Sequence, residues 1–445
     1  MDICRVKKRE KVAYGMGDLG NNIAYGAVGF YFVFFLTDVA GLSPLWAGNI
    51  FMIIRLWNAF SDLIMGIISD KTRSKYGRRR PFLLYGALPL GICFALLWMV
   101  PFDSKQSLII YYAIAGFLFN TLYSFVAIPY NALLPEMSQD YDERTSISGY
   151  KMAFSFIGSL LSAMGVTLIV DVIYSGKLQY QVSFPVMGRI LAGILVICII
   201  IAFLGTQERV KIEDTQSSSG IFKSIISLIK LKEYRYVLGV FLFNMVAFDI
   251  IMVMYIYYMK YALNISDDFS SIFMAIPLIS AVVATPFWVS LSNKIGKKKT
   301  YIVSTFYFMI PLVVCLILPA NTMLLTLIIT VMIGIGISAS QVLIFSILPD
   351  VVEVDQQKNG EKREGIIYGV TMFLYKIGSA FIIAAVTAMM GMFGYIESNG
   401  IGIVKQTESA IIGIRVLMSL APIFCLLLTI ISISRLKLDK QSSVL

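Results

Sequence analysis

Histidine is absent from this sequence of 445 residues, and charged residues make up only 14% of it. Without histidine, the chain has no imidazole metal ligand, no histidine proton relay and no Ser-His-Asp or Cys-His catalytic arrangement. Hydrophobic residues make up 58% of the chain, more than the roughly 45–50% of a typical soluble protein, whose charged fraction is about 25%. The small charged fraction and the large hydrophobic fraction together exclude a soluble globular protein.

Cysteine is also scarce, since the chain has five. Four of them, Cys93, Cys198, Cys315 and Cys425, fall within apolar runs, and no two have the spacing of a metal motif. The sequence therefore predicts no disulfide framework, no bound metal and no cofactor. The basic N-terminus has no small-residue cleavage site after a short apolar stretch, so we expect no cleaved signal peptide.

Apolar runs of about 20 residues, the length that crosses the hydrocarbon core of a bilayer, recur along the whole chain. They are continuous rather than alternating, so we predict an all-α polytopic membrane protein and not a β-barrel. We expect twelve transmembrane helices in two six-helix halves. The expected spans are 13–38, 45–69, 82–101, 107–136, 149–172, 186–205, 236–260, 269–291, 301–319, 322–349, 366–394 and 410–434.

The net charge of +10 comes from cations that cluster in every second connection between the spans. This distribution is typical of membrane topology and not of a nucleic-acid partner, and it places both termini on the cytoplasmic side of a cytoplasmic (inner) membrane. The longest polar segment, 206–235, ends in IFKSIISLIKLKEYR, whose pattern predicts an amphipathic helix on the membrane surface. We therefore expect an N-terminal bundle (1–205), a cytoplasmic middle loop (206–235) and a C-terminal bundle (236–445).

The two halves share sequence features. SDKTRSKYGRRRPF follows the second span and SNKIGKKKTY follows the eighth, which pairs Gly77 with Gly296. ALLPEMS and SILPDVV end the fourth and tenth spans, which pairs Pro135 with Pro349. A duplicated six-helix unit with a basic loop after its second span is typical of the major facilitator fold, whose solute site lies at the membrane midplane between the halves.

Polar residues interrupt the second span at Arg55, Asn58 and Asp62. The spacing i, i+3, i+7 places them on one helical face. An ionised side chain at the bilayer centre costs about 2.5–3.5 kcal/mol on insertion scales, so such residues face the protein interior and are functional by default. We interpret Asp62 as the coupling site; the alternative is a structural ion pair of Asp62 with Arg55 or Lys376.

Three stretches carry a resemblance to a known family. YGMGDLGNN, DKTRSKYGRRRPFLL and LPDVVEVDQQKNGEKREGIIYGVTMFLYKIGSA resemble the glycoside–pentoside–hexuronide:cation symporters. The resemblance implies that carboxylates on the second and fourth spans hold the coupling cation. Here Asp62 is kept, whereas Asn58, Ala127 and Asn22 stand where that family has acidic residues. Lys376 matches the lysine of the family's eleventh span.

The small number of acidic residues at these positions bears on the identity of the coupling ion. A sodium ion needs several hard oxygen ligands, and Asp62 is nearly the only carboxylate left. A single carboxylate beside a movable cation suits a proton better, because protonation changes which partner the carboxylate meets. We therefore favour H⁺ over Na⁺, although Asn58, Asn22 and Ser61 could supply neutral oxygens to a metal ion.

A second polar face, on the first span, suits a sugar because amides hydrogen-bond to hydroxyls and aromatic rings stack on the apolar side of a sugar. Hydrogen bonding between helices would explain the same residues. The isolated carboxylate Asp249 is a second proton site, a substrate contact or the partner of an unseen donor. The substrate-binding candidates are Asp62, Lys376, Asp18, Asn21, Tyr25, Tyr130, Asn131, Gln341 and Asp249, with Asn22, Tyr150 and Lys151 nearby. Asn131 and Gln341 replace the aromatics that flank the galactoside in melibiose-type members of the family.

Charged residues at the predicted cytoplasmic ends of the spans form another group. The resemblance implies a gate of salt bridges there; a plain topology signal would explain the arginines but not the matched acids. Exposed pairs are individually worth about 0–1 kcal/mol, which suits a reversible gate. The expected gate residues are Asp70, Arg73, Arg79, Glu136, Arg144, Asp350 and Arg363.

Together these features predict a secondary transporter that carries a sugar or glycoside with a cation by alternating access. Its partners would be a small-molecule solute and the lipid bilayer, without nucleic acid, and it would function as a monomer. One alternative is a transporter of the same fold for a non-sugar solute or a lipid. Another is a polytopic membrane enzyme, for which only Asp and Glu chemistry would remain without histidine or a cysteine pair.

Overall fold

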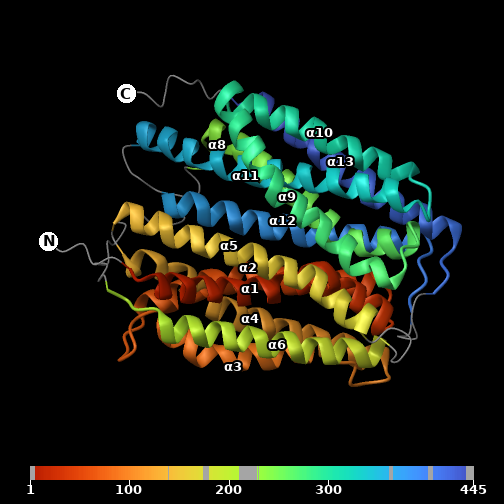
Figure 1. Ribbon diagram of the computed structural model, residues 1–445, viewed down its shortest axis with the longest axis horizontal. Helices are drawn as coiled ribbons and strands as arrows, with labels where there is room; N and C mark the ends of the chain where they lie inside the picture. The colour runs from red at the N-terminus through yellow and green to blue at the C-terminus, as the bar shows by residue number, and fades with distance from the viewer. Residues whose placement is uncertain are drawn as a thin grey trace. The chain divides into compact units, whose positions relative to one another are not determined.

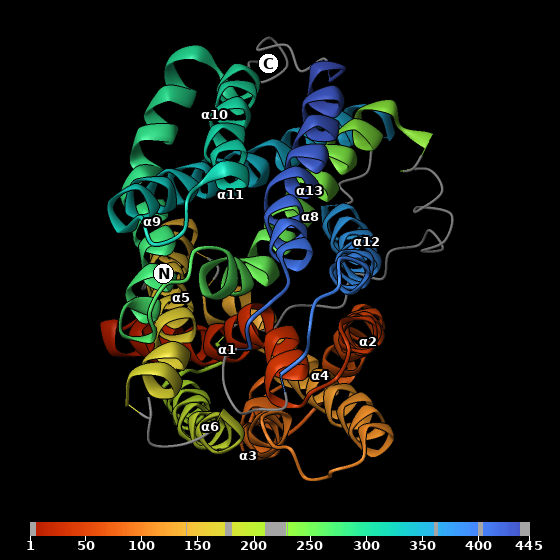
Figure 2. The ribbon, with the colours of Figure 1, turned by 90° about the vertical axis from the view of Figure 1, so that its right-hand side faces the viewer.

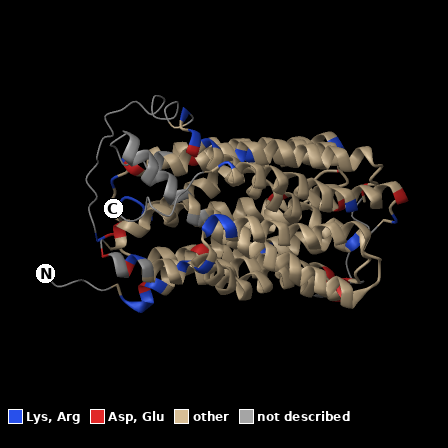
Figure 3. Ribbon diagram, turned by 90° about the horizontal axis from the view of Figure 1, so that it is seen from above, with Lys and Arg blue, Asp and Glu red and all other residues tan. Residues whose placement is uncertain are grey.

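The computed structural model describes residues 6–138, 140–173, 180–209, 228, 230–359, 364–398 and 404–436 (Figure 1). Within these residues, twelve helices are long and apolar enough to cross a membrane, and no strand is present. The prediction of an all-α protein with twelve spans is therefore confirmed. Figure 3 shows that charged residues gather at the helix ends, and most of the length between the ends carries neither sign.

The α-helices of the described residues extend beyond the hydrophobic cores of most spans. They are α1 (Lys8–Phe34), α2 (Pro44–Lys71), α3 (Arg80–Leu97), α4 (Lys105–Met137), α5 (Tyr141–Thr167), α6 (Tyr180–Gly205), α8 (Lys232–Tyr257), α9 (Asp267–Ile295), α10 (Lys297–Ile317), α11 (Met323–Asn359), α12 (Glu364–Met392) and α13 (Glu408–Ser434). Three π-helical turns, η1 (Phe35–Val39), η2 (Leu168–Ile173) and η3 (Tyr258–Ala262), continue α1, α5 and α8.

Several expected boundaries are wrong by more than a turn. α11 continues through Pro349 to Asn359, because a proline inside a helix removes one backbone hydrogen bond without forcing the chain to leave the helix. α6 begins at Tyr180, not 186, and also contains a proline, Pro185. α3 ends at Leu97 rather than 101, where the chain enters a loop with Pro101.

The chain divides into two compact units. The first consists of residues 1–214, 266–274 and 396–405, and therefore contains α1 to α6 and the beginning of α9. The second consists of 215–265, 275–395 and 406–445. The domain limits at 205 and 236 stay a prediction, and most of the expected amphipathic helix in 206–235 lies outside the described residues.

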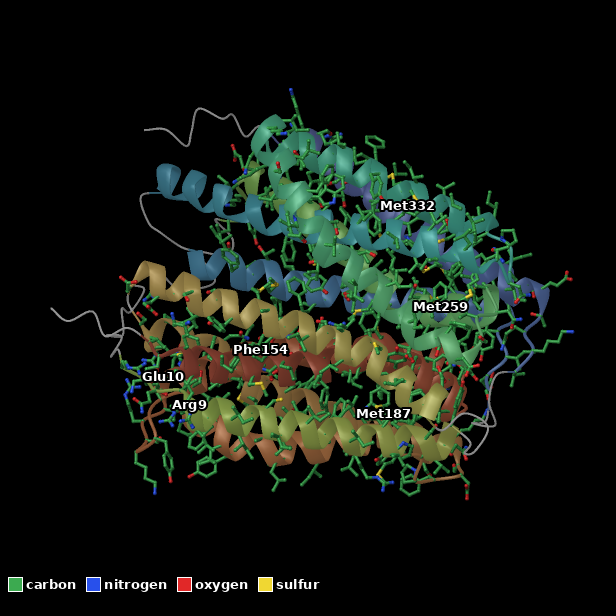
Figure 4. The ribbon with its side chains drawn as sticks, viewed as in Figure 1. Arg9, Glu10, Phe154, Met187, Met259 and Met332 are labelled. Atoms are coloured by element: carbon green, nitrogen blue, oxygen red, sulfur yellow. The ribbon has the colours of Figure 1, made fainter. Side chains whose placement is uncertain are left out.

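Inside the first unit, α1 packs against α5 and α6, α2 against α4, and α3 against α4 and α6 (Figure 2). Glycines let the backbones approach: a Cβ on Gly15 would lie 2.5 Å from Cδ2 of Phe154, which Figure 4 labels, and a Cβ on Gly26 would lie 2.1 Å from Oγ of Ser162. Small residues at helix contacts are the usual means of close packing in membranes. This packing holds α1, with its polar face, inside the unit.

Inside the second unit, α8 packs against α11, α12 and α13. Its core combines Tyr234 and Phe241 of α8 with Tyr301 of α10 and Tyr375 of α12. The loop before α10 turns at Gly296, whose φ of 88° matches the φ of 108° at Gly77 in the loop before α3. Both values favour glycine, so the two glycines paired by the internal repeat adopt the same kind of backbone conformation.

Candidate functional site

Asp62 lies in a cluster of oxygen-bearing side chains between α2 and α4, which we call the α2–α4 oxygen cluster (Asn58, Ser61, Asp62 and Ser124). Ser124 Oγ donates to Asp62 Oδ1 at 2.5 Å and lies 2.7 Å from Ser61 Oγ. Asn58 Nδ2 donates to Ser124 Oγ at 3.2 Å. Asn58 and Asp62 of the predicted second-span face therefore both contact Ser124 on the fourth span.

Ser124 is the member that sequence reasoning missed. The family resemblance directs attention to Ala127, which has no polar side chain. Ser124 lies three residues earlier on α4, so it occupies the same helical face one turn away. The i, i+3 spacing from Ala127 is the signal that could have found it.

Arg55 is held by aromatic side chains. Its NH1 donates to the hydroxyl of Tyr25 at 3.0 Å, and its guanidinium lies 5.3 Å from the ring centre of Tyr25 and 5.2 Å from that of Phe51. These three residues, with Asn58 and Asn120, line a cavity of about 20 Å³ beside the oxygen cluster. A cavity of this size holds about one water molecule, so the cluster has a small, mostly apolar cavity next to it.

The polar face of the first span meets α4 and α5 at Asp18. Asn22 Nδ2 donates to Asp18 Oδ2 at 3.2 Å, and Lys151 Nζ of α5 lies 3.9 Å from Asp18 Oδ1. The same Lys151 ammonium donates to Asn131 Oδ1 of α4 at 2.6 Å and lies 5.8 Å from the ring centre of Tyr130. Five candidates from three helices thus form one patch, which we call the Asp18 patch (Asp18, Asn22, Tyr130, Asn131 and Lys151).

Asn22, expected at the cation site, hydrogen-bonds within the Asp18 patch and accepts from Ser159 at 3.4 Å. The hydroxyl of Tyr130 donates to the backbone carbonyl of Tyr14 at 2.6 Å, and one face of the Tyr130 ring lies toward Lys151.

Asn21 is 4% exposed, and its Oδ1 has no hydrogen-bond partner among the described residues. A buried acceptor of this kind calls for a water or a ligand.

The remaining solute candidates lie in the second unit. Asp249 of α8 accepts hydrogen bonds at Oδ2 from the hydroxyls of Tyr375 (2.8 Å) and Ser379, both on α12. Lys376 is the residue after Tyr375 and is half-buried, as is Gln341 on α11. The structure thus supplies the donors that the sequence left unidentified for Asp249.

Three of the expected gate residues, Asp70, Arg79 and Glu136, form an ion network at the basic end of α2, α3 and α4. Arg79 pairs with Asp70 (NH2 to Oδ1, 2.5 Å) and with Glu136 (Nε to Oε1, 2.9 Å). Arg73 and Arg144 donate to backbone carbonyls. These contacts all lie within the first unit. The side chain of Asp350 and the whole of Arg363 lie outside the described residues, so the second half of the expected gate stays a prediction.

Glu208, just after α6, belongs to this network and was missed by sequence reasoning. Its carboxylate accepts the backbone N–H groups of Arg78 (2.6 Å), Arg79 (2.7 Å) and Arg80 (3.0 Å) at the start of α3. A carboxylate at a helix N-terminus is stabilised by the free N–H groups and the helix dipole. The next residue, Arg209, pairs with Glu10, labelled in Figure 4, at 2.6 Å.

The π-helical turns carry three buried charges that the sequence did not single out. Asp38 in η1 accepts from Thr37 Oγ1 at 2.5 Å, and Asp171 in η2 accepts from Ser270 Oγ at 2.9 Å. Lys260 in η3 is 3% exposed. These residues lie at the ends of the expected spans 13–38, 149–172 and 236–260, and the structure buries all three.

Comparisons with known proteins agree with this architecture. A family described as MFS/sugar transport protein matches residues 13–440. The uncharacterized symporter YnaJ of Bacillus subtilis is 29% identical, with 99% of this chain and 94% of the relative covered. A sodium-dependent lysophosphatidylcholine symporter 1-A of Danio rerio is 26% identical, with 97% and 86% covered. The structure of a bacterial homologue of the human lysosomal transporter Spinster has the same fold, with a TM-score of 0.70 at 12% identity and 96% of each chain covered.

Proposed function

The chain belongs to the MFS/sugar transport protein family, and from this premise we propose that it carries a sugar or glycoside together with a cation across the cytoplasmic membrane by alternating access. The observation that carries the proposal is the α2–α4 oxygen cluster, which places the Asp62 carboxylate against the Ser124 hydroxyl. The chain is a multi-pass membrane protein of a symporter family. Its termini would lie on the cytoplasmic side, and it would function as a monomer.

In this proposal, Asp62 is the coupling residue and the proton is the coupling ion. The cluster contains one carboxylate, and its hydroxyl partners can both donate and accept a hydrogen bond. When Asp62 takes up a proton, Ser124 turns its hydrogen away and accepts instead. A sodium ion would need the hydroxyls of Ser61 and Ser124 and the amide oxygen of Asn58 to turn toward a metal ion, so sodium coupling is the outcome that would overturn the choice of ion.

The solute would be bound by the Asp18 patch. Its carboxylate, amides and ammonium offer both acceptors and donors to sugar hydroxyls. We expect Asn21 and Tyr25 of α1 to contribute with them, and Lys376 and Gln341 from the second half. Coupling requires that the cation and the solute each raise the affinity for the other, by the same factor.

A second candidate is a solute with an acyl chain. Asn131 hydrogen-bonds to Lys151 where melibiose-type symporters have a sugar-flanking aromatic, and the relative from Danio rerio is named for lysophosphatidylcholine. In this case Lys151 would bind a charged headgroup instead of a hydroxyl. The same helices would then serve a different solute class with the same coupling site.

The test is uptake into proteoliposomes that contain the wild-type protein, Asp62→Asn or the control Asp103→Asn, whose position is exposed between α3 and α4. Labelled glycosides, pentosides and uronides are offered under a proton gradient and then under a sodium gradient, followed by lysophosphatidylcholine. We expect proton-driven accumulation that falls to equilibration in Asp62→Asn and is unchanged in Asp103→Asn.

Accumulation under the sodium gradient alone would overturn the choice of ion. Uptake of lysophosphatidylcholine without uptake of any sugar would overturn the solute class. Full accumulation in Asp62→Asn would remove Asp62 from the coupling site.

A further inference from the structure

Asp249 is a carboxylate in the middle of a transmembrane span, which runs from Lys232 to Ala262. It is 2% exposed. Tyr375 and Ser379 are one turn apart on α12, so both hydroxyls reach the same face of α8. Both donate to a single carboxylate oxygen, Oδ2. Two hydrogen bonds between α8 and α12 therefore share Oδ2 as their acceptor.

The elements that pack against α8 set the charges around this carboxylate. α11 carries no titratable residue between 323 and 344. Arg415 of α13 directs its guanidinium to the backbone carbonyls of Leu318 and Ala262. The charged residues on the membrane-spanning parts of the packed elements are Lys260 of η3, Lys376 of α12, and Glu408 and Arg415 of α13. Tyr375 and Ser379, which donate to Oδ2, carry neutral hydroxyls that can reverse their hydrogen bonds.

We propose that Asp249 is a second proton-binding residue, separate from Asp62, and that its protonation rearranges the hydrogen bonds between α8 and α12. A carboxylate accepts from both hydroxyls, whereas a carboxylic acid protonated at Oδ2 has become a donor there. At least one of the two hydroxyls must then turn and accept. One proton is bound, no bond between heavy atoms changes, and one negative charge is removed from the interior of the second unit.

Protonation at Asp249 would act on α12 at the residues that flank Lys376, a proposed solute contact. Tyr375 precedes Lys376 and Ser379 follows it by three positions, so a change in either hydrogen bond changes how this turn of α12 is held against α8. A proton bound at Asp249 would thus change how the turn that carries Lys376 is held. This role does not depend on whether the solute is a sugar or a lipid.

The experiment is infrared difference spectroscopy of the purified full-length protein in liposomes, without solute, as the buffer is stepped from mildly alkaline to mildly acidic. Protonation of a carboxylate produces a carboxylic C=O band. We expect Asp249→Asn to remove one such band and Asp62→Asn to remove a different one. Tyr375→Phe and Ser379→Ala should keep the Asp249 band and shift its frequency, because each removes one hydrogen-bond partner.

Two results would overturn the role of Asp249. In one, Asp249→Asn loses only an ionised carboxylate band at every pH, which would make Asp249 a permanently charged structural acceptor. In the other, neither hydroxyl variant shifts any carboxylic band; this comparison holds even if Asp249→Asn fails to fold. If Asp62→Asn removes a carboxylic band and Asp249→Asn removes none, the proposed transport function stands and the second proton site does not.

Discussion

In the proposed function, Ser124 is a hydrogen-bond partner of the coupling carboxylate, Asp62. It lies between Asp62, to which it donates, and Asn58, from which it accepts. Protonation of Asp62 would therefore change the hydrogen bond between Ser124 and Asn58.

We predict that Ser124→Ala shifts the cation dependence of uptake while the protein still folds. Ser124 donates to the ionised carboxylate of Asp62, and a hydrogen bond to a charged group contributes about 1.5–3 kcal/mol. Because the loss of this bond disfavours the ionised form, the proton concentration for half-maximal uptake should fall about tenfold or more. Uptake at graded pH and graded sodium measures this shift. Ser124→Thr keeps the hydroxyl and is the control; equal behaviour of the alanine and threonine variants would contradict the role.

Lys151 joins the Asp18 patch, the proposed solute site, because it reaches Asp18 and Asn131 from a third helix. We predict that Lys151→Met raises the KM for the solute at least tenfold and leaves the half-saturating cation concentration within about twofold, since neither Asp62 nor Ser124 is within its hydrogen bonds. Lys105→Met, an exposed position on α4, is the control. A shift in the cation dependence instead would show that the Asp18 patch and the oxygen cluster are one site.

At the scale of elements, the loop between α2 and α3 is shaped by the first residues after α6. Glu208 accepts hydrogen bonds from backbone N–H groups at the start of α3. Arg79 joins α2, α3 and α4 through its ion pairs with Asp70 and Glu136. The basic loop is thus bound inside its own unit by ion pairs and backbone hydrogen bonds. This explains why so many arginines lie in one loop beyond what topology requires.

Gly77 provides a sharp test of this loop. Its φ is 108°, and an added Cβ would lie 2.4 Å from Glu208 Oε2. We predict that Gly77→Ala lowers stability by about 1–3 kcal/mol, because alanine is strained at this φ and displaces the carboxylate. Gly66→Ala in α2, where an added Cβ meets nothing within 4 Å, should be neutral or stabilising by about 0.5–1 kcal/mol. Thermal unfolding in lipid nanodiscs compares the two, and equal melting temperatures would contradict the contact.

For the whole molecule, the sidedness of the loops follows from the positive-inside rule. We predict that Lys75→Cys, in the loop after α2, reacts with a membrane-impermeant maleimide only from the cytoplasmic side, and Ser104→Cys, in the loop after α3, only from the opposite side. Both positions are exposed. The background is a chain whose five native cysteines are replaced by serine. Labelling of both positions from one side would overturn the topology.

Periodicity and composition were enough to predict the twelve spans, the loops that carry the cations and the polar faces of Asp62 and Asp18, because hydropathy and helical spacing are properties of one segment at a time. Only the tertiary structure identified Ser124, the Lys151–Asn131 bond, the place of Glu208 and the donors to Asp249. Each of these is a contact between helices distant in the chain, and the relative rotation of packed helices is set by glycines and side-chain volumes that no single segment encodes. The same reason explains Asp38 and Asp171, since a charge at the end of a span is buried only when neighbouring elements cover it.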